Sequence, residues 1–302
     1  MSTSYHVAVI GLGAMGMGAA RSCLRAGLTT YGIDLSEQAR SQLQQAGAAA
    51  VMADARPLAE TLDAVLLLVV NAAQVRRILF GEEELARHLK PGTAIMVSST
   101  IAAEEASTLA AELAQLGLPM LDAPVSGGAI KADAGEMTVM AAGSDAAFDK
   151  LAPVLDAVSG KLYRVGSEPG QGSTVKIIHQ LLAGVHIAVA AEAMALASRA
   201  GVSLDLMYDV VTHAAGNSWM FENRMPRVLT GDYQARSAVD IFVKDLTLVA
   251  DTAKALRFPL PLASTALNMF LGASNAGHGQ EDDSAVIKTF SGITLPGQEE
   301  RP

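Results

Sequence analysis

The chain has 302 residues, of which 50% are hydrophobic and 18% are charged, and its formal net charge is −9. This length allows two packed domains, and the excess of apolar residues predicts contacts between copies of the chain, as a homo-dimer or homo-tetramer. The negative charge, together with the lack of any Lys/Arg cluster in the sequence, argues against a nucleic-acid partner.

Cysteine usage and hydropathy favour a cytoplasmic protein. Cys23 is the only cysteine in the sequence, so no disulfide can form within the chain. No basic and apolar signal region precedes the first strand, and the longest apolar run, 181–197, contains His186 and Glu192, which favours a buried helix over a membrane span. The histidines and the cysteine show no metal-ligand spacing, so no metal is expected.

Short β-rich runs alternate with helical patterns through the first half of the chain. Strands are predicted at 6–11, 29–34, 64–70, 94–99, 119–124, 136–143 and 161–166, with helices up to Ala26, from Ser36 and from Ala102. This alternation predicts βαβ units in a mostly parallel, doubly wound sheet, and the fully apolar strands fit burial on both faces.

The strand signals end at Gly166. The segment SEPGQG at 167–172 has the composition of a linker, and helical spacing follows at 174–200, 204–213, 238–256 and 261–273. We therefore predict an α/β chain with an N-terminal Rossmann domain over residues 1–168 and an all-helical domain over residues 169–302.

A glycine-rich motif follows the first strand and opens the first helix. Its glycines form G-x-G-x-x-G, a spacing that provides a tight turn, close approach of backbone to a pyrophosphate, and close packing of helix on strand. The helix N-terminus adds unpaired N–H donors for the phosphates. The residues predicted to bind the dinucleotide here are Gly11, Leu12, Gly13, Ala14, Met15 and Gly16.

Two further residues follow neighbouring strands. Asp34 ends the second strand, 23 residues after Gly11, where its carboxylate can accept hydrogen bonds from an adenosine ribose and would repel a 2′-phosphate. No arginine that could bind a 2′-phosphate follows Asp34 directly, the nearest being Arg40. NAD is therefore favoured over NADP. Thr100 follows the strand at 94–99 and is a second cofactor candidate; equally, it could cap the helix that begins at Ala102.

The segment DAPVSGG contains a candidate anion site. Ser126, Gly127 and Gly128 offer a hydroxyl and flexible backbone N–H groups after a strand, an arrangement that suits a substrate carboxylate. The same residues could equally form an ordinary glycine turn.

Four motifs in order, GLGAMG, DAPVSGG, GQGSTVK and KDL, resemble the β-hydroxyacid dehydrogenases, the family of 3-hydroxyisobutyrate dehydrogenase and tartronate semialdehyde reductase. The resemblance spans nearly the whole chain. It implies a Rossmann domain, a helical domain joined to it by a long helix, a nicotinamide cofactor, and a small anionic hydroxy acid as substrate.

The same resemblance assigns roles to several lysines and their neighbours. It implies that Lys176 exchanges a proton with the substrate hydroxyl, for which burial should depress its pKa; the alternative is a lysine that extends to solvent. His179 stands where many relatives have asparagine, and with Gln180 it shares a helix face with Lys176, so we expect both to bind substrate. Lys244 is implied to lie near the nicotinamide, although a solvated pair with Asp245 is the alternative.

The details of KIIHQLLAGVHIA, GNSWMFENRMP and RSAVDIFVKDL look most like the L-threonate-oxidising branch of this family, in which the C2 hydroxyl of a four-carbon sugar acid is oxidised with NAD. Two alternatives share the fold: reduction of tartronate semialdehyde and oxidation of 3-hydroxyisobutyrate. A third, a non-catalytic NAD sensor, would not need Lys176 beside an anion site.

Overall fold

The computed structural model describes residues 4–82 and 84–296. It divides into two compact units, the first ending at Lys176 and the second beginning at Ile177. This division lies inside one helix, a few residues after the predicted boundary at 168 and 169.

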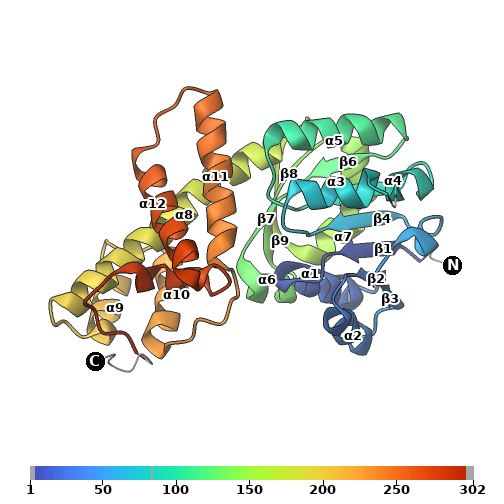
Figure 1. The fold of residues 1–302 in the computed structure, drawn as a ribbon. Helices are drawn as coiled ribbons and strands as arrows, with labels where there is room; N and C mark the ends of the chain where they lie inside the picture. Colours follow the sequence, from blue (N-terminus) through green and yellow to red (C-terminus); the bar gives the residue numbers. More distant parts are fainter. Residues whose placement is uncertain (1–3, 83, 297–302) are drawn as a thin grey trace. The chain divides into compact units, whose positions relative to one another are not determined.

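The first unit is built on one sheet, in the order β3-β2-β1-β4-β5-β6-β8-β7, with β9 paired to β8 (Figure 1). Strands β1 to β6 are parallel, β8 is antiparallel to β6 and β7, and β9 is parallel to β8. The strands are β1 His6–Ile10, β2 Thr29–Ile33, β3 Ala50–Met52, β4 Ala64–Leu67, β5 Ala94–Val97, β6 Met120–Asp122, β7 Val125–Ser126, β8 Met137–Ala142 and β9 Ser159–Gly166. The predicted, mostly parallel sheet is therefore confirmed.

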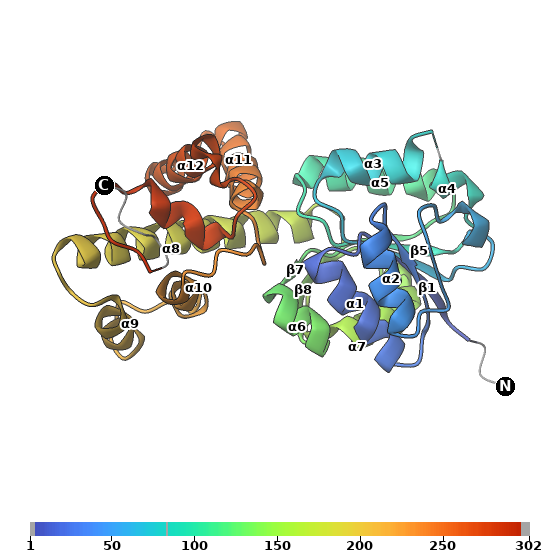
Figure 2. The same ribbon diagram turned by 60° about the horizontal axis from the view of Figure 1, so that its bottom comes forward.

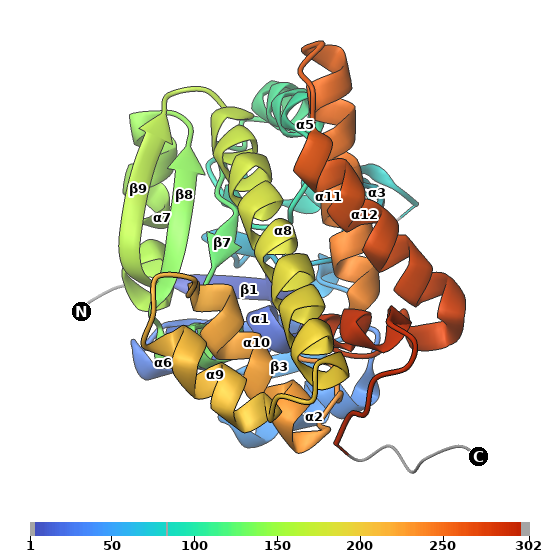
Figure 3. The ribbon, with the colours of Figure 1, turned by 90° about the vertical axis from the view of Figure 1, so that its left-hand side faces the viewer.

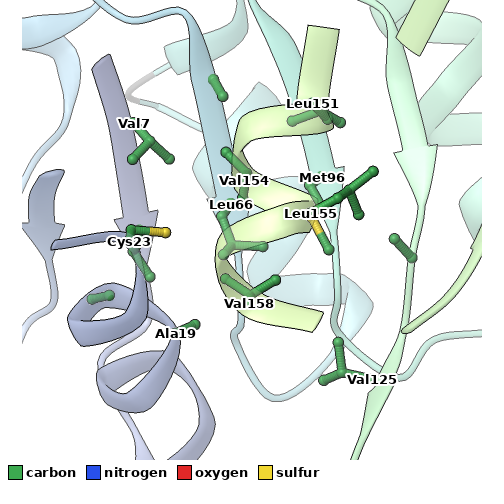
Figure 4. Close-up of a cluster of buried hydrophobic side chains, with 14 of the residues drawn as sticks. Val7, Ala19, Cys23, Leu66, Met96, Val125, Leu151, Val154, Leu155 and Val158 are labelled. Atoms are coloured by element: carbon green, nitrogen blue, oxygen red, sulfur yellow. The ribbon is translucent and has the colours of Figure 1, made fainter. Parts of the chain in front are cut away.

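Helices cover both faces of this sheet (Figure 2). Alternate residues of β1, β4 and β5 point to opposite faces, so that Val7 and Leu66 pack under α1 and α7, whereas Ala8 and Val65 pack under α3 and α5. Figure 4 shows the first of these cores, where Cys23 of α1 lies among the aliphatic side chains. The helices are α1 Ala14–Arg25, α2 Glu37–Gln45, α3 Ala72–Phe80, α4 Leu85–His88, α5 Ala103–Gln115, α6 Gly128–Ala134 and α7 Asp145–Val158, with a 3-10 turn η1 at Arg56–Leu58.

The second unit is helical, as predicted, and packs around the long helix α8 (Figure 3). Its core joins Ile187 and Met194 of α8 to Phe221 of α10 and to the stacked rings of Phe242 and Phe270. The helices are α8 Gln171–Arg199, α9 Leu204–Thr212, α10 Trp219–Thr230, α11 Val239–Ala255 and α12 Pro261–Ala273, followed by η2 Ser274–His278 and the 3-10 helix η3 Asp283–Thr289.

Helix α8 is long and apolar enough to cross a membrane by length and composition alone. Half of its most apolar window is buried inside the protein, and Ile187, Ala191 and Met194 belong to the core of the second unit. These contacts fit a core helix of the protein, as the sequence predicts.

Candidate active site

The glycine motif forms the turn between β1 and α1. Gly11 has a φ of +92°, which favours glycine, and a Cβ on Gly16 would lie 1.7 Å from the carbonyl oxygen of Gly11. Gly13 is exposed, and no side chain in the described ranges caps the first turn of α1. The helix therefore begins with N–H donors that can take up a phosphate group, which is the chemistry that the motif predicts.

Asp34 lies beside this loop. Its Oδ2 accepts a hydrogen bond from the Leu12 amide at 2.6 Å, and its Oδ1 accepts one from the Ser36 amide at 2.7 Å. Ser36, and not Asp34, caps α2, because its hydroxyl accepts from the Ala39 amide. The carboxylate thus stands at the end of β2 next to the glycine loop, where the residues fit the adenosine ribose of a dinucleotide.

Thr100 and the DAPVSGG segment lie near the ends of two other strands, β5 and β7. Thr100 follows β5 and is half-buried, and the suggestion that it caps α5 is wrong because Ala102 occupies the N-cap position. Ser126 ends β7, paired with Thr138 of β8. Gly127 is the N-cap of α6 and Gly128 its first residue, with φ values of +132° and +71°. Both glycines therefore need their conformational freedom to make this turn, and their roles as anion donors stay predictions.

The segment read as a linker is held firmly against the sheet. Asp122 at the end of β6 is fully buried, and its carboxylate accepts hydrogen bonds from the Gly170 amide at 2.8 Å, the Ser173 amide at 2.8 Å and the Ser173 hydroxyl at 2.7 Å. Burial raises the pKa of Asp122, and the hydrogen bonds from Ser173 and Gly170 oppose this rise. A Cβ on Gly172 would lie 2.4 Å from the Asp122 carbonyl oxygen, so glycine lets α8 begin this close to β6.

Asp122→Ala should destabilise the protein, because it leaves three buried donors of Gly170 and Ser173 without their acceptor. We expect a loss of about 2–4 kcal/mol in the free energy of unfolding, measured by urea denaturation. Asp133→Ala is the matched control, because the Asp133 side chain is 52% exposed and pairs with Arg21 at the surface. Equal stability of the two variants would show that Asp122 does not anchor α8.

Lys176 lies in the second turn of α8, one turn after Ser173. It is 6% exposed, so the alternative of a lysine that extends to solvent is wrong. Because α8 is continuous from Gln171 to Arg199, helix periodicity places Gln180 one turn further on the same face. A buried amine is suited to exchange a proton with a substrate. That role of Lys176 stays a prediction.

Three of the other predicted site residues, His179, Gln180 and Lys244, are connected in the second unit through Asp245. Lys244 Nζ lies 2.6 Å from Asp245 Oδ1, Gln180 Nε2 donates to Asp245 Oδ2 at 2.5 Å, and His179 Nδ1 lies 3.0 Å from Gln180 Oε1. Asp245 is 2% exposed, so a solvated pair with Lys244 is excluded. The sequence signal for this connection was weak, because Gln180 and Asp245 are 65 residues apart.

The GNSW segment before α10 makes contacts that mainly stabilise the start of that helix. The Ser218 hydroxyl caps α10 by accepting from the Phe221 amide at 3.1 Å, and Asn217 Nδ2 donates to Glu222 Oε1 at 2.5 Å. Trp219 is 50% exposed, so it does not belong to the core of this unit.

Comparison with known proteins agrees with this arrangement. Residues 6–166 match the model of the NAD binding domain of 6-phosphogluconate dehydrogenase, and residues 170–290 match that of the NAD-binding region of NADP-dependent 3-hydroxyisobutyrate dehydrogenase. The chain is 72% identical over 98% of both chains to L-threonate dehydrogenase of Escherichia coli O6:H1, and 54% identical, over 98% of this chain and 100% of the relative, to L-threonate dehydrogenase of Cupriavidus necator.

A solved structure is equally close. The crystal structure of a protein described as 3-hydroxyisobutyrate dehydrogenase from Salmonella typhimurium is 69% identical, covers 95% of this chain and 100% of its own, and superimposes with a TM-score of 0.92. The Rossmann fold, the helical second unit and the nicotinamide cofactor NAD are thereby confirmed. The chain belongs to the β-hydroxyacid dehydrogenase family, with 3-hydroxyisobutyrate dehydrogenase among its members, and is an NAD-dependent hydroxyacid dehydrogenase.

Proposed function

We propose that this dehydrogenase oxidises L-threonate at C2 to 2-oxo-tetronate (2-dehydro-L-erythronate), with NAD as the acceptor. The choice of L-threonate as substrate rests on the similarity, over almost the whole chain, to relatives named L-threonate dehydrogenase at 72% and 54% identity. The observation that supports the chemistry is the buried amine of Lys176 at the start of α8.

Each group of residues has a part in this reaction. The backbone amides around Ser126, Gly127 and Gly128 bind the substrate carboxylate, and the uncharged amine of Lys176 accepts the proton of the C2 hydroxyl. Loss of that proton turns the C2–O bond into a carbonyl as the hydrogen on C2 departs with its electron pair. NAD, when bound, supplies the acceptor for this hydride. His179 and Gln180 bind the rest of the sugar acid, and Lys244 and Thr100 contact the cofactor.

A panel of acids tests the substrate. Purified protein with NAD⁺ should form NADH with a higher kcat/KM on L-threonate than on D-threonate, D- and L-erythronate, D-glycerate or 3-hydroxyisobutyrate. 3-Hydroxyisobutyrate is the second candidate because the Salmonella relative carries that description. If 3-hydroxyisobutyrate gave the highest kcat/KM, it would replace L-threonate as the assigned substrate. Reduction of tartronate semialdehyde with NADH would test the remaining alternative. NAD binding without turnover of any acid would instead favour a sensor.

Asp34→Asn should weaken the preference for NAD over NADP. The amide keeps an acceptor for the Leu12 amide but removes the charge that repels a 2′-phosphate. We expect the ratio of kcat/KM with NAD to kcat/KM with NADP to fall about tenfold or more. Asp149→Asn, which changes an exposed acidic residue on α7, is the control. An unchanged ratio in Asp34→Asn would contradict the role of Asp34.

The proposal includes assembly into a dimer or tetramer through α8. Ile178, Leu182, Val189 and Leu196 are 53–68% exposed, and with half-buried Val185 they form a stripe with alternating spacings of four and three residues, interrupted at Glu192. Two helices can pack along such a stripe. A second copy of the chain, related by a two-fold axis, would present the same stripe to the first.

Leu182→Glu combined with Val189→Glu should therefore produce monomers in sedimentation experiments, because each change places a charge in the apolar seam. Leu256→Glu is the control, since Leu256 is 73% exposed and lies at the end of α11. An oligomer that survives the double substitution would place the interface elsewhere.

A further inference from the structure

Helix α8 receives its capping side chain from another part of the fold. The helix begins at Gln171, and the residue before it, Gly170, has no side chain. Asp122 of β6 takes this place, because its Oδ2 accepts hydrogen bonds from the amides of Gly170 and Ser173, both at 2.8 Å. Ser173 is the third residue of the helix, and its amide is one that an N-cap side chain normally binds. Asp122 therefore caps α8 from a neighbouring strand.

The capped turn is buried and closely packed. Asp122 and Ser173 are 0% and 1% exposed, and the Ser173 hydroxyl adds a third hydrogen bond, to Asp122 Oδ1 at 2.7 Å. A Cβ on Gly172 would lie 2.4 Å from the carbonyl oxygen of Asp122 and 2.7 Å from that of Met140. The backbone of this turn thus lies directly against β6 and β8, and the three hydrogen bonds hold it there.

Lys176 depends on this turn for its place. Ser173 and Lys176 are three residues apart on one face of α8, and both are buried, whereas Thr174 and Val175 between them are exposed. Helical side chains lean towards the N-terminus, so a lysine at this position packs over the turn that contains Ser173. If this turn frays or shifts, the amine of Lys176 moves with it.

We propose that Asp122 is a positioning residue of the reaction, which fixes the first turn of α8 and thereby holds the Lys176 amine where it accepts the substrate proton. This inference rests on the proposed function, because it takes Lys176 to be the proton-exchanging group. Asp122 itself need not touch substrate or cofactor. Its effect on the rate comes from geometry, since a displacement of about 1 Å can cost about 100-fold.

A split between kcat and KM tests this role. Asp122→Ala should lower kcat on L-threonate about 100-fold per folded molecule. KM should change less than about threefold, because Asp122 holds the helix and not the substrate. KM that rises while kcat is kept would mean that Asp122 serves substrate binding and would overturn the proposal.

Asp122→Asn should restore most of the lost kcat. Its amide oxygen can accept from the amides of Gly170 and Ser173, and its NH₂ can donate to the Ser173 hydroxyl. We expect kcat within about threefold of the wild type. If the asparagine variant were as slow as Asp122→Ala, the charge and not the cap would matter, and the proposal would be wrong.

Ser144→Ala is the matched control, because it removes the side chain that caps another helix of the same unit. The Ser144 hydroxyl accepts from the Ala147 amide at the start of α7. Its loss should lower stability but leave kcat per folded molecule unchanged. A loss of kcat as large as that in Asp122→Ala would mean that general loosening of the unit explains both.

Acetylation of Lys176 tests its positioning without any turnover. Lys176 is 6% exposed, so an amine-acetylating reagent should modify it slowly in the wild type, in Asp122→Asn and in Ser144→Ala. In Asp122→Ala the first turn should open more often and raise this rate about tenfold or more. Mass spectrometry of the peptide that contains Lys176 measures the rate. An unchanged rate in Asp122→Ala would show that Asp122 does not hold the lysine.

A second variant keeps the proposal testable if Asp122→Ala does not fold. Ser173→Ala removes the hydrogen bond to Asp122 Oδ1 and keeps both backbone bonds. It should lower kcat and raise the acetylation rate, each by about three- to tenfold, and no change in either would overturn the proposal. If Lys176→Ala turns over like the wild type, the proposed function fails, while acetylation still decides whether Asp122 holds Lys176.

Discussion

Replacing Lys176 with alanine should lower kcat on L-threonate by about 100- to 10,000-fold, the usual contribution of a general acid or base. Affinity for NAD should change little, since we expect the glycine loop and Asp34, and not Lys176, to hold the nucleotide. Lys176→Arg should be almost as inactive, because a guanidinium keeps its charge but does not give up its proton at working pH. The measurements are steady-state kinetics and NAD titration by fluorescence.

The matched control for this prediction is Lys254→Ala, which removes an exposed lysine from α11. It should keep wild-type kcat and stability. Lys176 is 6% exposed, so its removal also tests whether the amine is costly to bury: Lys176→Ala should be no less stable than the wild type. Turnover that survives in Lys176→Ala would contradict its role in proton transfer.

Replacing Gly13 with alanine should abolish NAD binding without harming the fold. A Cβ at Gly13 meets no atom of the described residues within 4 Å, so the change fits the free protein and should leave the melting temperature within a few degrees. The same methyl group would stand where the backbone has to approach the pyrophosphate. We expect the Kd for NAD to rise about 100-fold or more, equivalent to about 3 kcal/mol.

Gly16→Ala separates packing from binding. Its Cβ would lie 1.7 Å from the Gly11 carbonyl oxygen, which is backbone and cannot move without opening the turn between β1 and α1. We expect this variant to lose several kcal/mol of stability as well as NAD binding, an effect of about the size seen for severe overpacking. If Gly13→Ala bound NAD normally, the glycine loop would not be the pyrophosphate site.

The sheet was predictable because its signals are local. β4 and β5 are fully apolar runs, and each is buried on both faces of the sheet as parallel strands require. The antiparallel pairing of β8 with β6 and β7 could not be read in the same way, because strand direction depends on the path of the chain between strands.

The sequence analysis did not predict α3, α4, α6, α7 and α10, and three of these omissions have physical explanations. α7 and α10 contain Pro153 and Pro226 in their interiors, which read as breakers because proline removes a helical hydrogen bond. The capping serines, Ser144 and Ser218, were the signals that could have found both helices. α6 has seven residues between Gly127 and Gly135, so its glycines suggested a turn.

The site was predictable where motifs place chemistry next to a strand end and not where it depends on distant contacts. The glycine loop and Asp34 meet as the motif implies, with Leu12 and Asp34 hydrogen-bonded. The anchoring of α8 by Asp122 and the link from Gln180 to Asp245 join residues 48–65 positions apart. No local pattern encodes such pairs, so the structure was needed to find them.

L-threonate carrying deuterium at C2 tests the central claim most directly. Incubated with the enzyme and NAD⁺, it should give NADH that contains one deuterium, together with unlabelled 2-oxo-tetronate, and mass spectrometry of the reduced cofactor measures both the transfer and its origin. Unlabelled NADH formed from this substrate would mean that the hydride leaves another carbon, and no NADH at all would mean that L-threonate is not what the enzyme oxidises.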